Sequence, residues 1–581
     1  MKSVMKRHTR SLGNIADLQS EIIIENGNVA SSTNKIRGKF SIIKEYLIDY
    51  TASSNLHGLR YIGEKQRTIV EKIFWLFMFS SSVILCSVLI RQIWIRWNER
   101  PVIVSFAETY TPVWQIPYPA VTICVETKVK QSKFNFTEYF RLYNDPTTYV
   151  NLTVEERLLY EDVMLLCDEH LAPPYARKFS IVNETIENLR ELAPDISETF
   201  SGCSWKNTPT KCSELFSTMI TQKGFCYTFN SLGAEDLFRV ENLHTDYEHL
   251  EYSKKNESWS LEGGYPPNTP LETYPHRGSG YGAKAGLSLS LTVKKIDLDY
   301  LCTGPIQGFK IYLHNPAELP RFSQQYFRSP LSQEVIVAVK PKMMTTSEGL
   351  KPYDAHRRQC YFPSERYLHY FKVYTQANCE MECLTNFTFA RCGCVHFGLP
   401  HGPDMAVCNA GSVACLTKAQ MELEAIEIKS AFASEKNAND TMGEARKVAA
   451  RCECLPACTS IEYEAETSKE DYDWVAFLKA FEVSSEYLQS FVLARVRIFF
   501  KESQFIASRR SELYSRTDFL ANCGGLLGLF MGFSILSVAE ILYFFSLRLC
   551  CVIWNKHTKR HKVENIGVQP KPAKITYIYM D

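Results

Sequence analysis

The sequence of 581 residues lacks an excess of charge of either sign, because 65 Lys and Arg residues face 64 Asp and Glu residues. Proteins that bind nucleic acid usually carry a basic surplus, so no nucleic-acid partner is expected. The HExxH and GxSxG motifs of hydrolases are missing as well. The glycine-rich stretch 278–286 has neither GxGxxG spacing nor the Lys and hydroxyl pair of a phosphate loop. The sequence therefore predicts neither an enzyme nor a bound cofactor.

Two long runs without charge indicate the class of protein. They cover residues 73–90 and 519–539, and each can cross about 30 Å of hydrocarbon as a helix. The alternative, two buried helices of a soluble domain, is disfavoured because such helices rarely reach this length without charge. The first run is not a signal peptide, because 72 residues precede it. We expect transmembrane helices over residues 69–95 and 519–547.

The two tails predict the orientation in the membrane. Residues 1–72 hold 12 Lys and Arg against 7 Asp and Glu, and residues 548–581 hold 7 against 2. Because basic residues collect on the cytosolic side, we expect tails 1–68 and 548–581 inside the cell. Residues 96–518 of this multi-pass plasma membrane protein would then be extracellular. The N-glycosylation sequons agree, since they all lie between the two runs, at Asn135, Asn151, Asn183, Asn256, Asn386 and Asn439.

Cysteine usage also fits an extracellular domain. Sixteen of the 20 cysteines lie between Cys124 and Cys458, an even number in an oxidising compartment, so disulfides are expected. The densest group brackets a helical insert at residues 416–451. Zinc is the alternative there, but the Cys-x2-Cys pairs typical of zinc sites are absent, and no metal is predicted. The disulfide candidates are Cys124, Cys360, Cys379, Cys383, Cys392, Cys394, Cys408, Cys415, Cys452, Cys454 and Cys458.

The rest of the predicted extracellular part mixes strands with helices. A helix is expected at residues 153–170, where apolar residues recur at helical spacing behind a Thr-x-x-Glu capping pattern. Alternating apolar residues predict strands at 118–124, 286–293, 308–316, 334–341 and 490–502. The predicted fold class is a two-span α-helical membrane protein with a large disulfide-rich α+β ectodomain.

The second apolar run carries small residues and an acid. Gly528 and Gly532 have the spacing that lets two helices approach closely. Glu540 is costly in lipid and is expected to face water or the interior of a helix bundle. Two spans cannot surround a pore, so conduction would require an oligomer with one second span per subunit around its axis. Backbone carbonyls beside the glycines, the Ser534 hydroxyl and a ring of Glu540 carboxylates would then suit a small monovalent cation.

Seven motifs in a fixed order resemble the degenerin/epithelial sodium channel (DEG/ENaC) family, nearest to its insect pickpocket branch. They run from His57 to about Leu547, and they are His57-Gly58, YPAVTIC, GFKIYLHNPAELP, RQCYFPSERYLHYFKVYTQANCEMECL, CGC, CECLPAC and GGLLGLFMGFSILSVAE. The resemblance implies a palm, knuckle, finger and thumb ectodomain. It also implies a trimeric, voltage-insensitive, amiloride-sensitive sodium channel, gated by an extracellular stimulus in sensory or epithelial sodium transport.

The same resemblance assigns roles to individual residues. They are Gly532, Phe533 and Ser534 in the selectivity filter, Glu540 in the pore, and His57, Gly58 and Ala521 in gating. Gly528 and Ser537, small residues of the same span, are further candidates for the pore. From composition alone, Gly58 would simply be a turn residue at positive φ.

The sequence departs from the family at three places. Phe533 is not small, and Tyr543 stands where acid-sensing relatives have a second acid. Residues 347–360 lack the Trp that these relatives carry near the base of the thumb, so proton gating is not carried over.

The partners implied are related subunits in a homo- or heterotrimer, the lipid bilayer, and an unidentified extracellular ligand or mechanical tether, with Na⁺ as the permeant ion. Mechanical load, a peptide, a small molecule, osmolarity and pH stay open as the stimulus. An ATP-gated two-span channel is one alternative, but no cluster of lysines for a nucleotide stands out. The other is a non-conducting or regulatory receptor subunit, in which Glu540 would serve helix association.

Overall fold

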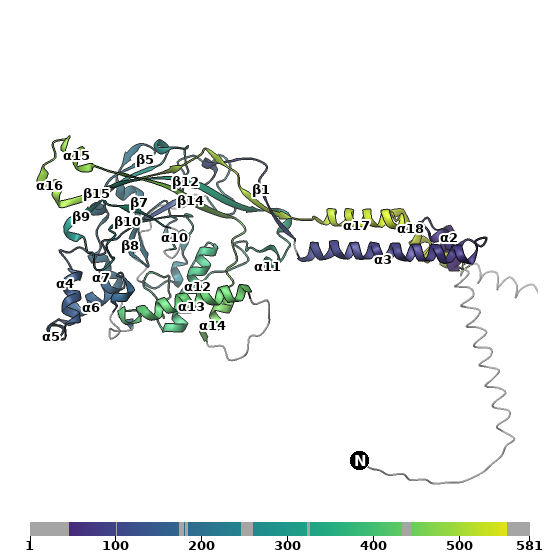
Figure 1. The fold of residues 1–581 in the computed structure, drawn as a ribbon, viewed down its shortest axis with the longest axis horizontal. Coiled ribbons are helices and arrows are strands. Elements are labelled where there is room, and N and C mark those ends of the chain that lie inside the picture. Colours follow the sequence, from purple (N-terminus) through teal and green to yellow (C-terminus); the bar gives the residue numbers. More distant parts are fainter. Residues whose placement is uncertain are drawn as a thin grey trace, which may run out of the picture. The chain divides into compact units, whose positions relative to one another are not determined.

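The computed structural model describes residues 46–99, 101–172, 179–180, 184–245, 259–321, 326–432, 444–552 and 554 (Figure 1). The chain forms two compact units. We call them the helical unit, which combines Met1–Pro101 with Leu513–Asp581, and the sheet unit, Val102–Glu512.

The helical unit contains both apolar runs. Helix α2, Leu59–Gly63, precedes the long helix α3, Ile69–Glu99, which extends beyond the expected end at residue 95. The expected second span is two helices, α17 (Arg516–Met531) and α18 (Ile535–Tyr543), and α18 continues as the π-helical turn η9, Phe544–Arg548. Among the described residues, two helical stretches are long and apolar enough to cross a membrane, Ile69–Glu99 and Ile535–Val552.

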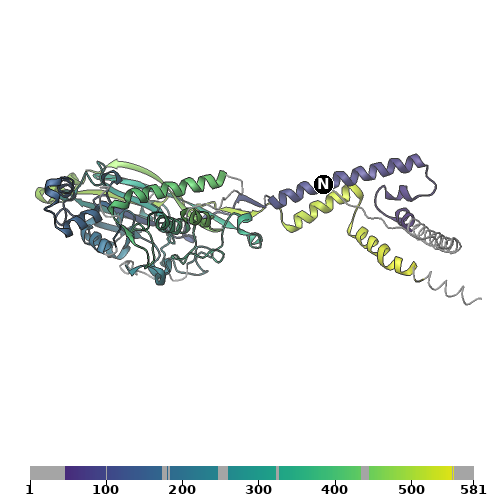
Figure 2. The ribbon, with the colours of Figure 1, turned by 90° about the horizontal axis from the view of Figure 1, so that it is seen from below.

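Helix α17 packs along α3, and α18 turns away from it, as the yellow segments in Figure 2 show. The Trp97 ring stacks on the Phe519 ring with 4.9 Å between centroids. The Ser82 hydroxyl donates to the Phe530 carbonyl at 2.7 Å. Helix α17 begins at a capping box formed by Ser515 and Asp518, which satisfies backbone N–H groups of its first turn.

Two large sheets, beside two short two-stranded ones, build the described part of the sheet unit. The larger runs β1-β17-β12-β15-β9-β5-β6, with β14 paired to β12, and the smaller runs β11-β10-β3-β8-β7. The strands of the larger sheet are β1 Val102–Phe106, β5 Phe200–Trp205, β6 Thr208–Thr210, β9 Leu287–Lys294, β12 Gln333–Thr346, β14 Ser460–Asp471, β15 Phe491–Phe500 and β17 Ser508–Glu512. Those of the smaller sheet are β3 Ala120–Val125, β7 Phe216–Thr221, β8 Gly224–Phe229, β10 Gly308–His314 and β11 Phe327–Pro330.

All five strands predicted from alternation are present, as β3, β9, β10, β12 and β15. Their alternation has a direct cause in burial. On β12, for example, Val335, Val337 and Val339 are fully buried while the residues between them are half-exposed. The expected α+β ectodomain is therefore confirmed.

Helices cover part of the sheets and form a separate packed group. The helix predicted at residues 153–170 is shorter, because α6 spans Val154–Met164 and is followed by the 3-10 turn η2, Glu169–Leu171. Its predicted capping box, between Thr153 and Glu156, is present. The separate group consists of α12 (Gln376–Cys392), α13 (Val413–Phe432) and α14 (Glu444–Cys452), and the last two overlap the helical insert predicted at 416–451 and extend past it at both ends.

Eight disulfides brace the sheet unit and use all the predicted cysteines. The pairs are Cys124–Cys226, Cys167–Cys302, Cys203–Cys212, Cys360–Cys458, Cys379–Cys454, Cys383–Cys452, Cys392–Cys415 and Cys394–Cys408. Five of them lie within residues 360–458, so the sulfurs proposed as zinc ligands are bonded to one another. The disulfide interpretation therefore holds over the zinc alternative.

Three of the predicted glycosylation residues lie in described segments. Asn151 is exposed, whereas Asn135 is half-buried and caps α4, Phe136–Asn144, by accepting from the Glu138 N–H. Asn386 is half-buried on α12. Asn183, Asn256 and Asn439 lie outside the described residues. Glycosylation stays a prediction at all six positions.

Candidate functional site

The predicted selectivity filter coincides with the break between α17 and α18. Gly532 has φ +66°, a left-handed conformation, and its N–H donates to the Gly528 carbonyl at 2.9 Å. The Phe533 N–H donates to the Leu527 carbonyl at 3.3 Å, so two hydrogen bonds close the end of α17. A Cβ atom at Gly532 would lie 2.7–2.8 Å from the His57 ring. Backbone conformation and lack of space therefore both require glycine at this position.

Ser534 restarts the helix after the break. Its hydroxyl accepts from the Ser537 N–H at 3.3 Å, and the Ser537 hydroxyl accepts from the Ser534 N–H at 3.2 Å. This reciprocal pair satisfies N–H groups that the first turn of α18 would leave without a partner. Both serines predicted in the pore thus position the backbone of the break.

The break leaves carbonyl groups without helical partners. The carbonyls of Phe530 and Met531 accept from the Ser82 hydroxyl and the His57 N–H. Among the described residues, no backbone N–H donates to the carbonyls of Gly532 and Phe533. In lipid, such groups are tolerated only where they face protein or a water-filled cavity. They are also the groups that can replace water around a cation.

The predicted gating residues His57 and Gly58 lie directly against this break. The His57 N–H donates to the Met531 carbonyl at 3.0 Å. Gly58 has φ +83° and caps α2, so the turn expected from composition is present. A Cβ at Gly58 would lie 3.6 Å from the Trp75 ring on α3. The turn before α2 therefore contacts two elements. It is hydrogen-bonded to the break through His57, and it packs on the first span through Gly58.

The remaining predicted pore and gating residues lie on both sides of the break. The Glu540 side chain is half-buried on α18, and Asn55 Nδ2 donates to Glu540 Oε2 at 3.4 Å. Gly528 is on α17 near its end, while Ala521 is exposed near the start of the same helix. Tyr543, which stands where acid-sensing relatives have a second acid, is exposed. The structure thus brings His57, Gly58, Gly532, Phe533 and Ser534 together but leaves Ala521 apart from them.

A second contact between the chain ends was missed by sequence reasoning. Residues 46–53 are helical, and the Tyr46 hydroxyl donates to the Phe544 carbonyl. The Tyr50 ring meets the Phe544 ring edge-on at 5.1 Å, and Asp49 pairs with Arg548 at 2.7 Å. We call these five residues the inner clasp. The spacing of Tyr46 and Tyr50, four residues apart on one helix face, is the signal that could have indicated it.

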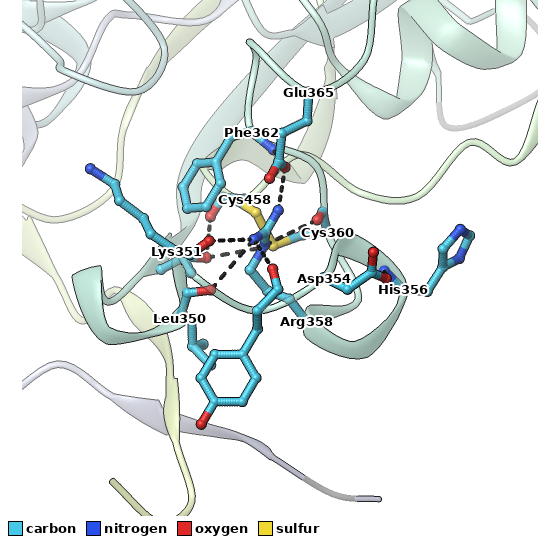
Figure 3. Close-up of polar contacts among 11 residues, drawn as sticks. Leu350, Lys351, Asp354, His356, Arg358, Cys360, Phe362, Glu365 and Cys458 are labelled. Atoms are coloured by element: carbon cyan, nitrogen blue, oxygen red, sulfur yellow. Dashed lines mark hydrogen bonds and ion pairs between the residues drawn. A yellow bond between two sulfur atoms is a disulfide. The ribbon is translucent and has the colours of Figure 1, made fainter. Parts of the chain in front are cut away.

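The sheet unit contains a buried cation that sequence reasoning also missed. Arg358 has no exposed surface, and Figure 3 shows its guanidinium enclosed by the turn after β12. It donates to the Tyr353 carbonyl at 2.7 Å and pairs with the Glu365 carboxylate. It lies 4.4 Å from the centre of the Phe362 ring. It donates further to the carbonyls of Leu350, Lys351 and Cys360.

This Arg358 cluster fixes the chain where three elements meet. The Ser347 N–H, just after β12, donates to the Arg510 carbonyl of β17 at 2.9 Å. Cys360 is bonded to Cys458, and the Thr346 hydroxyl donates to the Cys458 carbonyl at 2.6 Å. Strand β17 and the disulfide-rich group are therefore both joined to the turn whose interior the buried Arg358 fills.

The comparison with known proteins agrees with these features. The family model described as "Amiloride-sensitive sodium channel" matches residues 50–544. Pickpocket protein 28 of Drosophila melanogaster is 29% identical over 541 residues, which cover 89% of this chain and 81% of that protein. Sodium channel protein Nach of Drosophila ananassae is 24% identical, with 89% of each chain covered.

A vertebrate relative matches at a similar level. Acid-sensing ion channel 2 of Homo sapiens is 23% identical, with 85% of this chain and 84% of that protein covered. The match spans most of the chain and includes the break at Gly532, the His57 turn and the paired cysteines. The resemblance drawn from the motifs is thereby confirmed. The chain belongs to the amiloride-sensitive sodium channel (DEG/ENaC) family, and it is a sodium channel subunit rather than an enzyme.

Proposed function

We propose that this chain lines the pore of a trimeric, voltage-insensitive, amiloride-sensitive sodium channel of the plasma membrane, opened by an extracellular stimulus. Three second spans would surround the pathway, because two spans of one chain cannot enclose it. The partners are copies of this chain or related subunits.

The left-handed break at Gly532 is the observation that carries this proposal. It leaves the carbonyls of Gly532 and Phe533 without a backbone N–H donor from the described residues, within an apolar segment where such groups must face protein or a water-filled cavity. In a trimer, three sets of these carbonyls, with the Ser534 hydroxyls, would replace part of the hydration shell of Na⁺. The carboxylates of Glu540 would raise the local cation concentration. The Phe533 side chain can then point away from the axis without loss of selectivity.

Gating would act through the loop that carries His57. Because its N–H bonds the Met531 carbonyl, a movement of the loop changes the backbone directly before the filter. Ala521, on the same helix α17, lies where a bulky side chain would bias the helix toward the open state. A stimulus received outside the cell would reach the same helix through the chain that follows β17.

The first test is whole-cell current from the chain expressed alone, with Ala521 replaced by a bulky residue and sodium exchanged for potassium. We expect an amiloride-blocked sodium current. In this background Gly532→Ala should lower the current at least tenfold at unchanged surface expression, because the new Cβ would meet the His57 ring. The matched control is Gly393→Ala. Gly393 also ends a helix at positive φ, +75°, but has open space around it, so the current should persist.

Each outcome decides between the readings. A normal sodium current from Gly532→Ala would refute the filter assignment. Silence of the parent chain despite surface expression would indicate an obligate partner subunit. If related subunits also fail to restore current, the non-conducting receptor reading would replace the channel proposal.

The proposed topology, with both tails cytosolic, is tested separately. Tags at the two ends should be reached by antibody only after permeabilisation, and glycosidase should shift the mass of the chain. A tag detected on intact cells would contradict the orientation.

A further inference from the structure

The sheet unit has a small cavity in which basic side chains outnumber acidic ones. Its volume is about 220 Å³. Four basic side chains line it, and they come from the segment after β3, the turn between β7 and β8, and strands β10 and β11. They are Lys128, Lys223, Lys310 and Arg328.

One buried acid lies among them. Glu126 is 3% exposed, and its carboxylate is 3.1 Å from Lys310 Nζ and 3.6 Å from a terminal nitrogen of Arg328. Neither carboxylate oxygen accepts a hydrogen bond from the described part of the chain. The only other acid lining the cavity is Asp168, which is exposed at its rim. The interior therefore holds four basic groups against one carboxylate.

The excess of positive charge is greatest at Lys128 and Lys223, the two lysines with which Glu126 forms no ion pair. Lys128 is 8% exposed, and its ammonium donates to the carbonyls of Val125 and Lys223 at 2.8 and 3.0 Å. Burial lowers the pKa of Lys128 to about 7, against the opposing effect of Glu126. Burial also lowers the pKa of the half-buried Lys223, against the opposing effects of Glu126, Glu169 and Asp168, none of which forms an ion pair with it among the described residues. A buried cation such as Lys128 with no carboxylate in contact is costly, so the cavity is suited to an anion.

The size of the cavity restricts the ligand. Pockets for drug-sized molecules measure about 300–1,000 Å³, so a cavity of about 220 Å³ suits a smaller group. Arg and Lys side chains together favour oxyanions, because a guanidinium can bind two oxygens at once. A second cavity of about 260 Å³ also has Cys167 and Lys223 in its wall, with the acid Glu169 and neutral polar groups such as Gln222.

We propose that this cavity is an extracellular binding site for a small oxyanion, a phosphate or a carboxylate group, held by Lys223, Lys310 and Arg328. The anion displaces Glu126 from part of its ion pairing with Lys310 and Arg328 and gives Lys223 an oxyanion in direct contact. A free inorganic anion fills the first cavity alone. A ligand that carries the oxyanion on a larger body extends past Lys223 into the second cavity.

Binding is measured on the purified full-length chain in detergent, with gluconate as the bulk anion at constant ionic strength. Inorganic phosphate should raise the thermal unfolding temperature in a saturable manner. Lys223→Met should weaken the phosphate affinity at least tenfold. The matched control is Lys211→Met, because the Lys211 side chain is 82% exposed and lies outside the cavity. This control should bind phosphate as the parent chain does.

A second variant distinguishes binding from a structural role. Glu126→Gln should bind phosphate more tightly, because it removes the carboxylate that competes for Lys310 and Arg328. A purely structural ion pair would give lower stability without tighter binding. Free glutamate, tested in place of phosphate, distinguishes a free inorganic anion from an oxyanion carried on a larger molecule. Only a ligand with a larger body can gain affinity from contacts in the second cavity. The proposal is overturned if phosphate has no saturable effect, or if Lys223→Met binds it like the parent chain.

Discussion

The two units of this chain are stabilised by different means. The sheet unit has eight disulfides, two sheets with a continuous apolar core, and a buried arginine whose hydrogen bonds are satisfied. The four cysteines of the helical unit are free thiols, and its central contacts are single hydrogen bonds between distant segments. The filter break, for example, is joined to the His57 loop by one backbone hydrogen bond and a ring that fills the space above a glycine.

This difference matches what each unit would have to do. A receptor for an external stimulus transmits force best when it is rigid, since a soft body would absorb the displacement. A gate must change between two arrangements that differ by only a few kcal/mol, so its contacts have to be few and individually weak. The comparison therefore predicts that substitutions in the sheet unit act on folding, whereas substitutions in the helical unit act on current.

The largest effect is expected in the sheet unit, for Arg358→Met. The change removes the donor of several carbonyls, those of Leu350 and Cys360 in buried contacts, and a buried acceptor left without a partner typically costs about 1–3 kcal/mol. It also leaves the Glu365 carboxylate, which is 33% exposed, without its ion pair. Together these losses are a large part of the stability of an ordinary domain, about 5–15 kcal/mol. Surface expression should fall strongly, and the purified chain should unfold at lower denaturant concentration.

The neighbouring arginine is the matched control. Arg357 is half-buried and lies 5.0 Å from the centre of the Tyr353 ring, so Arg357→Met should cost only about 0.5–1 kcal/mol. Equal losses of stability from the two variants would show that the buried charge is not what braces this turn. If Arg358→Met altered the current at normal surface expression, substitutions in the sheet unit would not act mainly on folding, and the contrast between the two units would be wrong.

Much of the sheet unit could be predicted from the sequence, because its signals are local. The strands alternate between buried and exposed residues, and α6 begins at a capping box that the residues of one turn define. The disulfide pairing could not be predicted, since spacing alone does not choose among 16 cysteines. Arg358 was missed because most of its acceptors are backbone carbonyls, which leave no trace in the sequence.

The candidate site was only partly predictable for a related reason. Gly532 and Ser534 stand out as small residues in an apolar run, and their helix-ending and helix-starting roles follow from local geometry. The inner clasp joins residues almost 500 positions apart, such as Asp49 and Arg548. No periodicity connects such segments. The contact arises because both flank spans that pack together.

A smaller effect is expected for Ser534→Ala in the helical unit. The loss of a helix cap typically costs about 1 kcal/mol, which is too little to unfold a packed span. It should still shift the backbone of the filter, so we expect surface expression near that of the parent chain and a reduced preference for sodium over potassium. Ser534→Thr keeps the capping oxygen and should retain more of the preference.

The control for this variant is Ser87→Ala. The Ser87 hydroxyl donates only to the Val83 carbonyl of its own helix, α3, and the side chain is exposed. Its removal should leave selectivity unchanged. If Ser534→Ala abolished surface expression while Ser87→Ala did not, the helical unit would depend on its helix caps for folding. This would contradict the expectation that substitutions in the helical unit act on current.

The smallest effect is expected at the inner clasp, for Asp49→Asn. The Asp49 and Arg548 side chains are 55% and 34% exposed, and ion pairs of this kind contribute about 0–1 kcal/mol, a change of at most about fivefold in an equilibrium. We expect a change of that size in the ratio of open to closed channels, with surface expression and selectivity unchanged. Arg548→Gln should shift the ratio further in the same direction, because it also removes the contact of the guanidinium with the Phe544 ring at 4.4 Å. The double variant should shift the ratio no further than Arg548→Gln does, because the ion pair is already lost. Arg60→Gln removes the exposed pair with Glu64 within α2 and should have no effect on the ratio. Additive shifts from the two single changes would mean that the pair does not hold the two segments together, and the aromatic contacts of Tyr50 would then be the part of the clasp that couples to the gate.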